Sequence, residues 1–197
     1  MRPVGKRLKS AILIDESNAL HQLQDVGVGG FRSWKKFYLA IERYLKDIYG
    51  EKMTTDFNFY GTLPPKGHVE EAKYNSRYKF FEALQHDGIN VFRGECYFQE
   101  DGTFKEKQLD VLMALDIYEY SVYKYEYIVV FSGDADFVPA VERAKKNGTT
   151  IFALLEKNKP AFHLRNMVHI VIDINTIIEG MDQQTLIPAK SSLKGNT

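Results

Sequence analysis

An uninterrupted apolar segment that ends in two carboxylates is the feature that most constrains how this chain can fold. Residues 127–131 read Tyr-Ile-Val-Val-Phe. Apolar side chains at every position favour a strand covered on both faces, as in the middle of a parallel sheet. A small turn, Ser132-Gly133, follows, and Asp134 and Asp136 come directly after it. Because ligands of open α/β sheets bind beyond the carboxyl ends of the strands, these aspartates are candidate functional residues.

Strand-like and helix-like segments alternate along the rest of the chain, with Gly, Pro or Asn between them. Strands are predicted at residues 11–15, 54–60, 89–92, 149–155 and 169–172, and a hairpin at 95–104. Long helices are predicted at 33–49, 69–85, 107–122 and from Val138, with shorter helical stretches at 16–23, 160–166 and 174–178. The alternation predicts one α/β domain with a mainly parallel sheet and right-handed crossovers.

The two ends of the chain do not follow this alternation. We expect a flexible basic lead-in at residues 1–10, the domain at 11–180 and a disordered tail at 183–197, where Lys, Ser, Gly and Asn accumulate.

Composition narrows the class of protein. The chain has 26 Lys+Arg and 26 Asp+Glu residues, and this balance excludes a uniformly basic nucleic-acid-binding surface while allowing a local basic patch. The single cysteine, Cys96, permits no internal disulfide, and no segment approaches the ~18 apolar residues of a membrane helix. We therefore expect a cytoplasmic protein without a membrane partner.

Further carboxylates are expected at the edge where Asp134 and Asp136 lie. Parallel strands end at one edge, so Asp15, after the strand at 11–15, would face the same crevice. At 100° per residue, Asp110 lies in the first helical turn and away from the apolar stripe of that helix. Asp116 falls within the stripe, about 9 Å further along the axis, so we expect it as a supporting group beneath the site.

A cluster of this kind favours a hard divalent cation. Neighbouring carboxylates repel one another unless a cation lies between them, and oxygen ligands without Cys or His favour Mg²⁺ or Mn²⁺. Such ions most often act on phosphate esters. A purely structural interpretation stays open as well, with Asp134 as a helix N-cap and Asp15 as a turn former near Asn18.

Three sequence blocks together resemble the NYN domain, including its LabA-like branch, within the PIN-like nuclease superfamily. They are IDESN at residues 14–18, KQLDVLMALD at 107–116 and SGDADFVP at 132–139, and the resemblance extends over roughly residues 10–180. It implies a Rossmann-like, three-layer fold that binds Mg²⁺ or Mn²⁺ and cleaves RNA.

The resemblance also implies roles for particular residues. The positions that match the catalytic and metal-binding acidic cluster are Asp15, Asp110, Asp134 and Asp136. Asn18 matches the asparagine that supports the first aspartate. Glu16 and Gln108 stand where many relatives have glycine, which removes no ligand but alters the loops at the mouth of the site.

Several other residues are candidates for contact with phosphate or RNA. Lys107 could hold a phosphate beside the metal, and the small Ser132-Gly133 turn would let a phosphate approach the backbone. Thr62 and Lys66 lie in a loop after a predicted strand. Lys73 and Arg77 alternate with tyrosines, a mixture that suits single-stranded nucleic acid and equally a solvated helix face.

The sequence thus predicts a Mg²⁺- or Mn²⁺-dependent endoribonuclease, a hydrolase acting on single-stranded or structured RNA. Two other classes remain open. One is a non-catalytic RNA-binding or regulatory module with the same fold, and the other is a phosphatase or nucleotide-processing enzyme that uses the same ions. An aromatic content of 13% also permits a homodimer.

Overall fold

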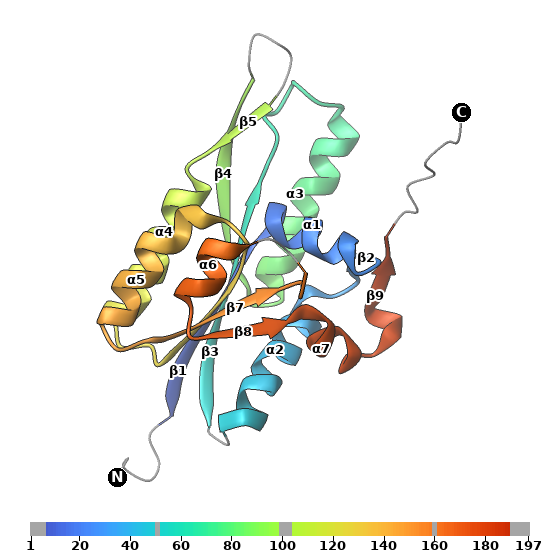
Figure 1. Cartoon of the computed structure of the whole chain (residues 1–197). Helices are drawn as coiled ribbons and strands as arrows, with labels where there is room; N and C mark the ends of the chain where they lie inside the picture. Colours follow the sequence, from blue (N-terminus) through green and yellow to red (C-terminus); the bar gives the residue numbers. More distant parts are fainter. Residues whose placement is uncertain (1–6, 50–51, 99–103, 159–160, 190–197) are drawn as a thin grey trace, which may run out of the picture.

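A twisted sheet of seven strands runs through the middle of the protein, with helices on both faces (Figure 1). The computed structural model describes residues 7–49, 52–98, 104–158 and 161–189. The strand order is β5-β4-β3-β1-β6-β7-β8, and each neighbouring pair is parallel except β4-β5. The strands are β1 (Leu8–Asp15), β3 (Met53–Thr62), β4 (Asn90–Phe98), β5 (Phe104–Lys107), β6 (Tyr127–Phe131), β7 (Thr150–Leu155) and β8 (Ile170–Asp173). The predicted α/β class is confirmed.

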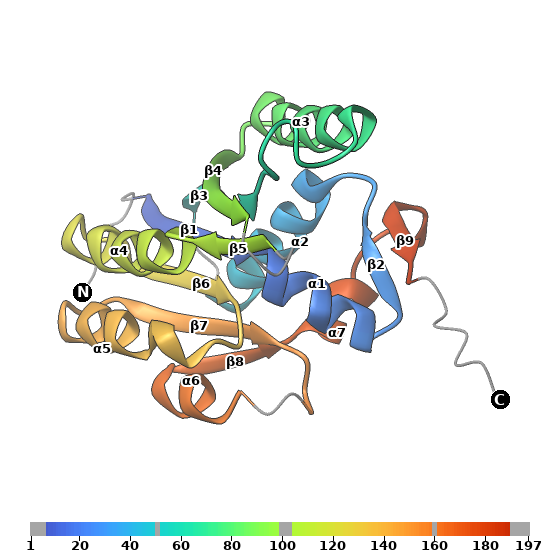
Figure 2. The ribbon, with the colours of Figure 1, turned by 90° about the horizontal axis from the view of Figure 1, so that it is seen from above.

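The helices form two layers, one on each face of the sheet (Figure 2). One layer contains α1 (Glu16–Asp25), α2 (Trp34–Tyr49), α3 (Glu71–His86) and α7 (Ile174–Glu179). The other contains α4 (Leu109–Val122), α5 (Val138–Lys146) and α6 (Phe162–Met167). Alternate residues of β1 enter different cores: Ile12 and Ile14 pack in the first, and Ala11 and Leu13 in the second. This two-sided burial explains why the central strands have apolar side chains at successive positions.

The N-terminal ends of α4 and α5 lie at the carboxyl edge of the sheet, because α4 leads down to the start of β6 and α5 follows the end of β6. A short 3-10 helix, η1 (Ala135–Phe137), joins β6 to α5. The predicted helix from Lys107 begins two residues later, at Leu109, since Lys107 is the last residue of β5. The strands β4 and β5 pair as the predicted hairpin, whose tip lies outside the described residues.

The disordered tail predicted from Gln183 is wrong for its first six residues. They form a 3-10 helix, η2 (Gln183–Thr185), and a strand, β9 (Leu186–Pro188). This strand pairs with β2 (Val28–Phe31) in a separate antiparallel sheet, and neither strand was predicted from the sequence. A Cβ on Gly29 would lie 2.9 Å from the carbonyl oxygen of Pro188, so the close approach of the two strands requires glycine.

A ladder of polar contacts fixes α4 on the sheet. Three successive residues on one face of β3 bind side chains from α4 or from the residues just after it. The pairs are Asp56 with Tyr125, Asn58 with Tyr120 (2.9 Å) and Tyr60 with Asp116 (2.6 Å). Burial raises the pKa of Tyr120 to about 12, so its hydroxyl remains a hydrogen-bond donor at neutral pH. Asp116 is thereby anchored beneath the sheet edge.

No helix in the described part of the chain combines the length and the apolar character needed to cross a membrane.

Replacing Tyr60 by Phe should destabilise the fold at neutral pH by about 1–3 kcal/mol, because the half-buried Asp116 carboxylate loses its donor. Burial raises the pKa of Asp116, and the Tyr60 hydroxyl partly offsets that rise. Protonation of Asp116 relieves the cost of burying its charge, so the difference between variant and wild type should shrink as the pH falls toward about 4. Urea unfolding at several pH values measures this. Tyr123→Phe, at an exposed position, should change nothing.

Truncation after Met181 removes η2 and β9 and should lower the melting temperature by roughly 3–8 °C, because β2 loses its backbone partner. Truncation after Ala189 keeps β9 and serves as the control. Equal melting curves for the two proteins would show that β9 contributes nothing to stability.

Candidate acidic active site

A continuous set of hydrogen bonds joins the carboxyl ends of β1 and β6. Asp15 Oδ2 accepts from Asn18 Nδ2 (2.9 Å) and from Ser132 Oγ (3.0 Å). Asn18 Oδ1 in turn accepts from the Gly133 backbone N–H (3.2 Å), and Ser132 Oγ accepts from the Asp134 N–H (3.1 Å). Asp15 is 8% exposed and Ser132 is fully buried. The carboxylate of Asp15 is therefore held in a fixed orientation relative to the turn that carries Asp134.

Two of the aspartates are also helix caps: Asp134, as its structural interpretation predicted, and Asp15, which was predicted as a turn former. Asp15 Oδ1 accepts from the Asn18 N–H at the start of α1 (3.3 Å). Asp134 Oδ1 accepts from the Asp136 N–H at the start of η1 (2.9 Å). A carboxylate offers about four acceptor positions, so a cap leaves room for a further ligand. The capping role and a functional role are compatible for both residues.

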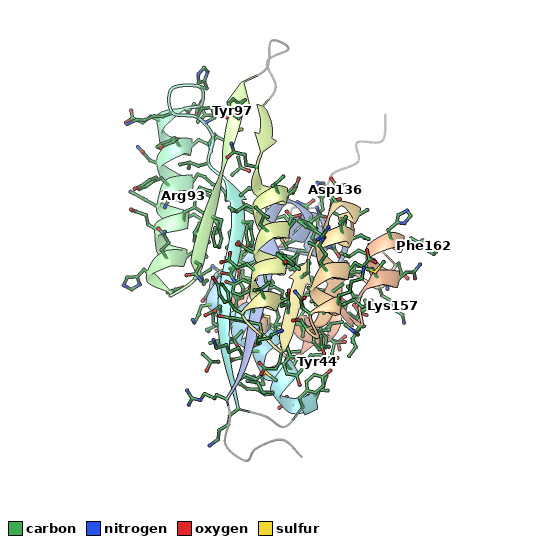
Figure 3. The ribbon with its side chains drawn as sticks, turned by 90° about the vertical axis from the view of Figure 1, so that its left-hand side faces the viewer. Tyr44, Arg93, Tyr97, Asp136, Lys157 and Phe162 are labelled. Atoms are coloured by element: carbon green, nitrogen blue, oxygen red, sulfur yellow. The ribbon has the colours of Figure 1, made fainter. Side chains whose placement is uncertain are left out.

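Asp110 and Asp136 lie in the wall of one cleft between α4 and α5. Figure 3 shows Asp136 at the N-terminal end of α5. Asp110 is held in the first turn of α4 by the packing of its neighbour Leu109 against Gly94, where a Cβ would lie only 2.5 Å from the Leu109 side chain. Gln108, just before the helix, has a φ of 80°. This left-handed conformation explains why glycine would suit the position.

The charges of the four aspartates act on one another. Partial burial of its carboxyl group raises the pKa of Asp110, and the negative charges of Asp15, Asp134 and Asp136 raise it further. Asp110 as a residue nevertheless remains exposed to solvent. The charges of the other three aspartates thus favour a proton or a cation on Asp110.

The chemistry of this donor set fits Mg²⁺ or Mn²⁺, since all four side chains offer hard oxygen atoms. In the described residues, no three His, Cys, Asp or Glu side chains lie close enough together to hold a metal ion. Assembly of such a site would therefore require movement of side chains, for which the exposed Asp110 and Asp136 have room.

Asp116 lies apart from the four and binds Tyr60, which is the register partner of Asp15 in the β1-β3 pair. It thus supports β3, the strand that pairs with β1 beside Asp15, and does not itself join the four aspartates. The Lys107 side chain lies outside the described part of the structure.

Glu16, which is buried, and Arg77, which is partly buried, form an ion pair beside this edge. The Arg77 guanidinium donates to both carboxylate oxygens of Glu16, and its Nε donates to the Thr62 carbonyl (3.0 Å). Together with Gly61 they line a cavity of about 250 Å³. The charge of Arg77 is therefore paired with that of Glu16, whereas Lys66 and Lys73 are exposed to solvent. A Cβ on Gly61 would lie 2.4 Å from Glu16 Oε2, so glycine makes room for the pair.

Gln22 is a component of the site that the sequence analysis missed. Its side chain is fully buried, and its Oε1 accepts from the Glu156 backbone N–H (2.8 Å). Its Nε2 has no hydrogen-bond partner among the described residues and lies 3.9 Å from where a Cβ on Gly133 would be. Gln22 stands four residues after Asn18, on the same face of α1, and this spacing could have revealed it.

Comparisons with known proteins agree with this architecture and place the chain in a family. A solved structure of a protein of unknown function from Vibrio parahaemolyticus RIMD 2210633 has the same α/β fold, with a TM-score of 0.64 and 18% identity over 95% of this chain and all of that one. The sequence profile of the NYN domain matches residues 9–175. The chain belongs to the NYN domain family, which is a PIN-like nuclease family.

A named relative is the low amplitude and bright protein LabA of Synechococcus elongatus. It is 34% identical to this chain over 104 residues, which are 53% of this chain and 50% of that protein. The similarity thus spans about half the length of the relative.

Replacing Asp110 by Asn should raise the melting temperature without divalent ions by roughly 1–2 °C at pH 7, because it removes repulsion among the aspartates and solvent screens the exposed group. The raised pKa means that the stability cost of the ionised form is present at neutral pH and disappears on protonation, so the gain should vanish below about pH 4.

Added Mn²⁺ should stabilise wild type more than this variant. Calorimetry measures both effects, with Asp47→Asn on α2 as the matched control. A variant that gains as much from Mn²⁺ as wild type would exclude Asp110 as a ligand.

Proposed function

We propose that this protein is a Mg²⁺- or Mn²⁺-dependent ribonuclease that hydrolyses RNA phosphodiester bonds at the edge formed by Asp15, Asp110, Asp134 and Asp136. The observation that carries the proposal is the delivery of these aspartates to one edge by three separate elements: the end of β1, the start of α4 and the turn after β6. NYN domains generally act on RNA and generally depend on divalent metal ions, which supports the same assignment.

The four aspartates would hold the cation, which supplies activation of water and stabilisation of the departing oxygen when bound. Asn18 and Ser132 orient Asp15 through the bonds described above. The Ser132-Gly133 turn is occupied within the protein, because Ser132 is buried and the N–H groups of Gly133 and Asp134 are bonded to Asn18 and Ser132; its proposed role is therefore to position Asp134 and not to bind phosphate. Lys107 is proposed to bind phosphate from the last position of β5.

The RNA is proposed to cross the carboxyl edge in single-stranded or structured form, with Thr62, Lys66 and Lys73 along its path. Lys66 and Lys73 are exposed on the side of the sheet that carries α3. Arg77 is paired with Glu16 and would contribute by fixing Glu16 at the rim of the site. A cytoplasmic location belongs to the same proposal.

Replacing Asp134 by Asn should lower Mn²⁺-dependent cleavage of a mixed RNA pool at least about 100-fold, beyond the 10–100-fold typical of a residue that only supports a ligand. Asn is as good an N-cap as Asp, so η1 should persist and only the charge is lost. Asp182→Asn is the matched control, because Asp182 caps η2 through the same bond to the backbone two residues on.

The assay separates the competing classes of function. Retention of RNA without cleavage in wild type would indicate a binding module, and faster turnover of small phosphoesters than of RNA would indicate a phosphatase. Intact RNA with wild type in the presence of Mn²⁺, and no change on Asp134→Asn, would overturn the nuclease proposal.

A further inference from the structure

The stretch of sequence that follows β7 gathers positive charge in a chain that is neutral overall. Residues 157–172 include Lys157, Lys159 and Arg165 and contain no Asp or Glu. The charge balance of the whole chain excluded a uniformly basic surface but allowed a local basic patch, and this stretch has the composition of one. Residues 156–165, which run from the end of β7 into α6, are called the β7-α6 segment below.

A phenylalanine projects from this segment into solvent. Phe162, the first residue of α6, is 68% exposed, more than any other large hydrophobic side chain among the described residues. Figure 3 shows its side chain pointing away from the body of the protein. His163 meets the ring edge-on, with centroids 6.0 Å apart and planes at 86°, and Lys157 is exposed nearby in the sequence. Single exposed apolar residues are common, so the position of this ring relative to the acidic site decides its meaning.

The β7-α6 segment packs directly against the turn that carries Asp134. The Cβ of Ala161, the residue before Phe162, lies 3.4 Å from where a Cβ on Gly133 would be. Because consecutive Cα atoms are about 3.8 Å apart, the Cα of Phe162 lies no more than about 10 Å from that of Gly133. About three stacked nucleotides, at about 3.4 Å each, span that distance.

Hydrogen bonds hold the segment in place between α1 and α6. Gln22 Oε1 on α1 accepts from the Glu156 N–H (2.8 Å). Arg165 Nη2 on α6 donates to the carbonyl oxygens of Glu156 (3.0 Å) and Lys157 (3.1 Å). Lys157 and Phe162 are therefore carried by a segment that is fixed to the site, and a surface that is already ordered loses little entropy when a ligand binds.

The order of the strands places this segment on the opposite side of the aspartates from α3. The strands β3, β1, β6 and β7 are neighbours in that order. Lys66 follows β3, Asp15 ends β1, Asp134 follows β6 and Lys157 follows β7. Neighbouring strands lie about 4.8 Å apart, so a single strand of RNA can pass along the edge from Lys66, past the aspartates, to the β7-α6 segment.

We propose that the β7-α6 segment binds RNA beside the aspartates, with Phe162 stacked on a base and Lys157 in contact with a phosphate. This rests on the proposed function, because it takes single-stranded RNA as the ligand of the edge. Every base has a face that stacks on an aromatic ring, so the contact adds affinity without reading the sequence. The RNA-binding site then extends about three nucleotides beyond the bond that is cleaved.

A protein partner suits this surface less well than RNA. A phenylalanine side chain buries at most about 150–250 Å², whereas a stable interface buries about 800 Å² on each partner. The residues beside the ring are polar and exposed, as at Lys157 and His163, and the next apolar residue, Leu164, is fully buried in the core. One exposed ring with a cation near it matches a base and its phosphate.

The test is the binding of the whole protein to an oligouridylate of roughly ten nucleotides with 2-aminopurine at its centre, whose fluorescence falls when the base stacks on an aromatic ring. Binding is measured without divalent ions and again with Ca²⁺, and a gel verifies that the RNA stays intact. Wild type should quench the fluorescence. Phe162→Ala should weaken binding about 5- to 150-fold and abolish the quenching, and Phe162→Trp should restore both.

Tyr123→Ala is the matched control, because Tyr123 is 61% exposed at the end of α4, beside the opposite edge of the sheet. It should leave RNA binding unchanged. Circular dichroism checks that each variant folds.

A second variant tests the phosphate contact. Lys157→Ala should reduce the slope of the logarithm of the binding constant against the logarithm of the salt concentration by about 0.7, which is the contribution of one phosphate of a single strand. Lys52→Ala is its control, since Lys52 is exposed just before β3, at the amino edge of the sheet.

Equal binding by Phe162→Ala and wild type would overturn the proposal. So would tight binding by Phe162→Leu, which keeps an apolar side chain without a ring, or a wild type that binds no RNA. Binding to vesicles of anionic phospholipid that depends on Phe162, with RNA binding unaffected, would assign the surface to membranes instead. If RNA binds through Phe162 but is not cleaved with Mn²⁺, this proposal stands and the nuclease proposal fails.

Discussion

The carboxylate of Asp15 is the point on which the arrangement of the candidate site depends. It accepts hydrogen bonds from Asn18 on α1 and from Ser132 after β6, and Asn18 completes the circuit by binding the Gly133 N–H. Two parallel strands that are adjacent in the sheet but more than a hundred residues apart in sequence are thereby held at their carboxyl ends as well as along their ladder. A charged acceptor forms stronger hydrogen bonds than a neutral one, so the bonds to the Asp15 carboxylate rigidify this edge.

The polar ladder between β3 and α4 has a related effect on the other side of β1. It fixes the rotation of α4 about its axis, because tyrosine hydroxyls and the Asp116 carboxylate have a narrower choice of geometry than apolar side chains. That rotation decides which residues face the sheet edge and which face solvent. Asp110 at the edge and the exposed Leu115 on the outside are two results of the same fixed rotation.

The sequence predicted the elements whose own side chains carry the signal. The strand β6 was predicted to the residue because all its positions are apolar, and α2 because its buried residues recur at helical spacing. It could not predict β2 and β9, whose pairing rests on backbone hydrogen bonds and on the absence of a side chain at Gly29. The pair of Glu16 with Arg77 was also missed, since no spacing rule connects residues that far apart. Within the site, the sequence indicated that the aspartates share an edge. It could not predict the hydrogen bonds that join Asp15 to Gly133 through Asn18, because these depend on the positions of individual atoms.

The small β2-β9 sheet has a consequence for how the protein is made. The partner of β2 begins roughly 155 residues later in the chain, at Leu186. During synthesis at about 5–20 residues per second, β2 would wait roughly 8–30 s for that partner, while its backbone groups remain bonded to water. A nascent chain thus passes through a stage at which the strands of the central sheet have been synthesised but the backbone groups of β2 still lack their partner strand. Other nascent chains on the same polysome could pair with that edge until β9 is synthesised and pairs with β2.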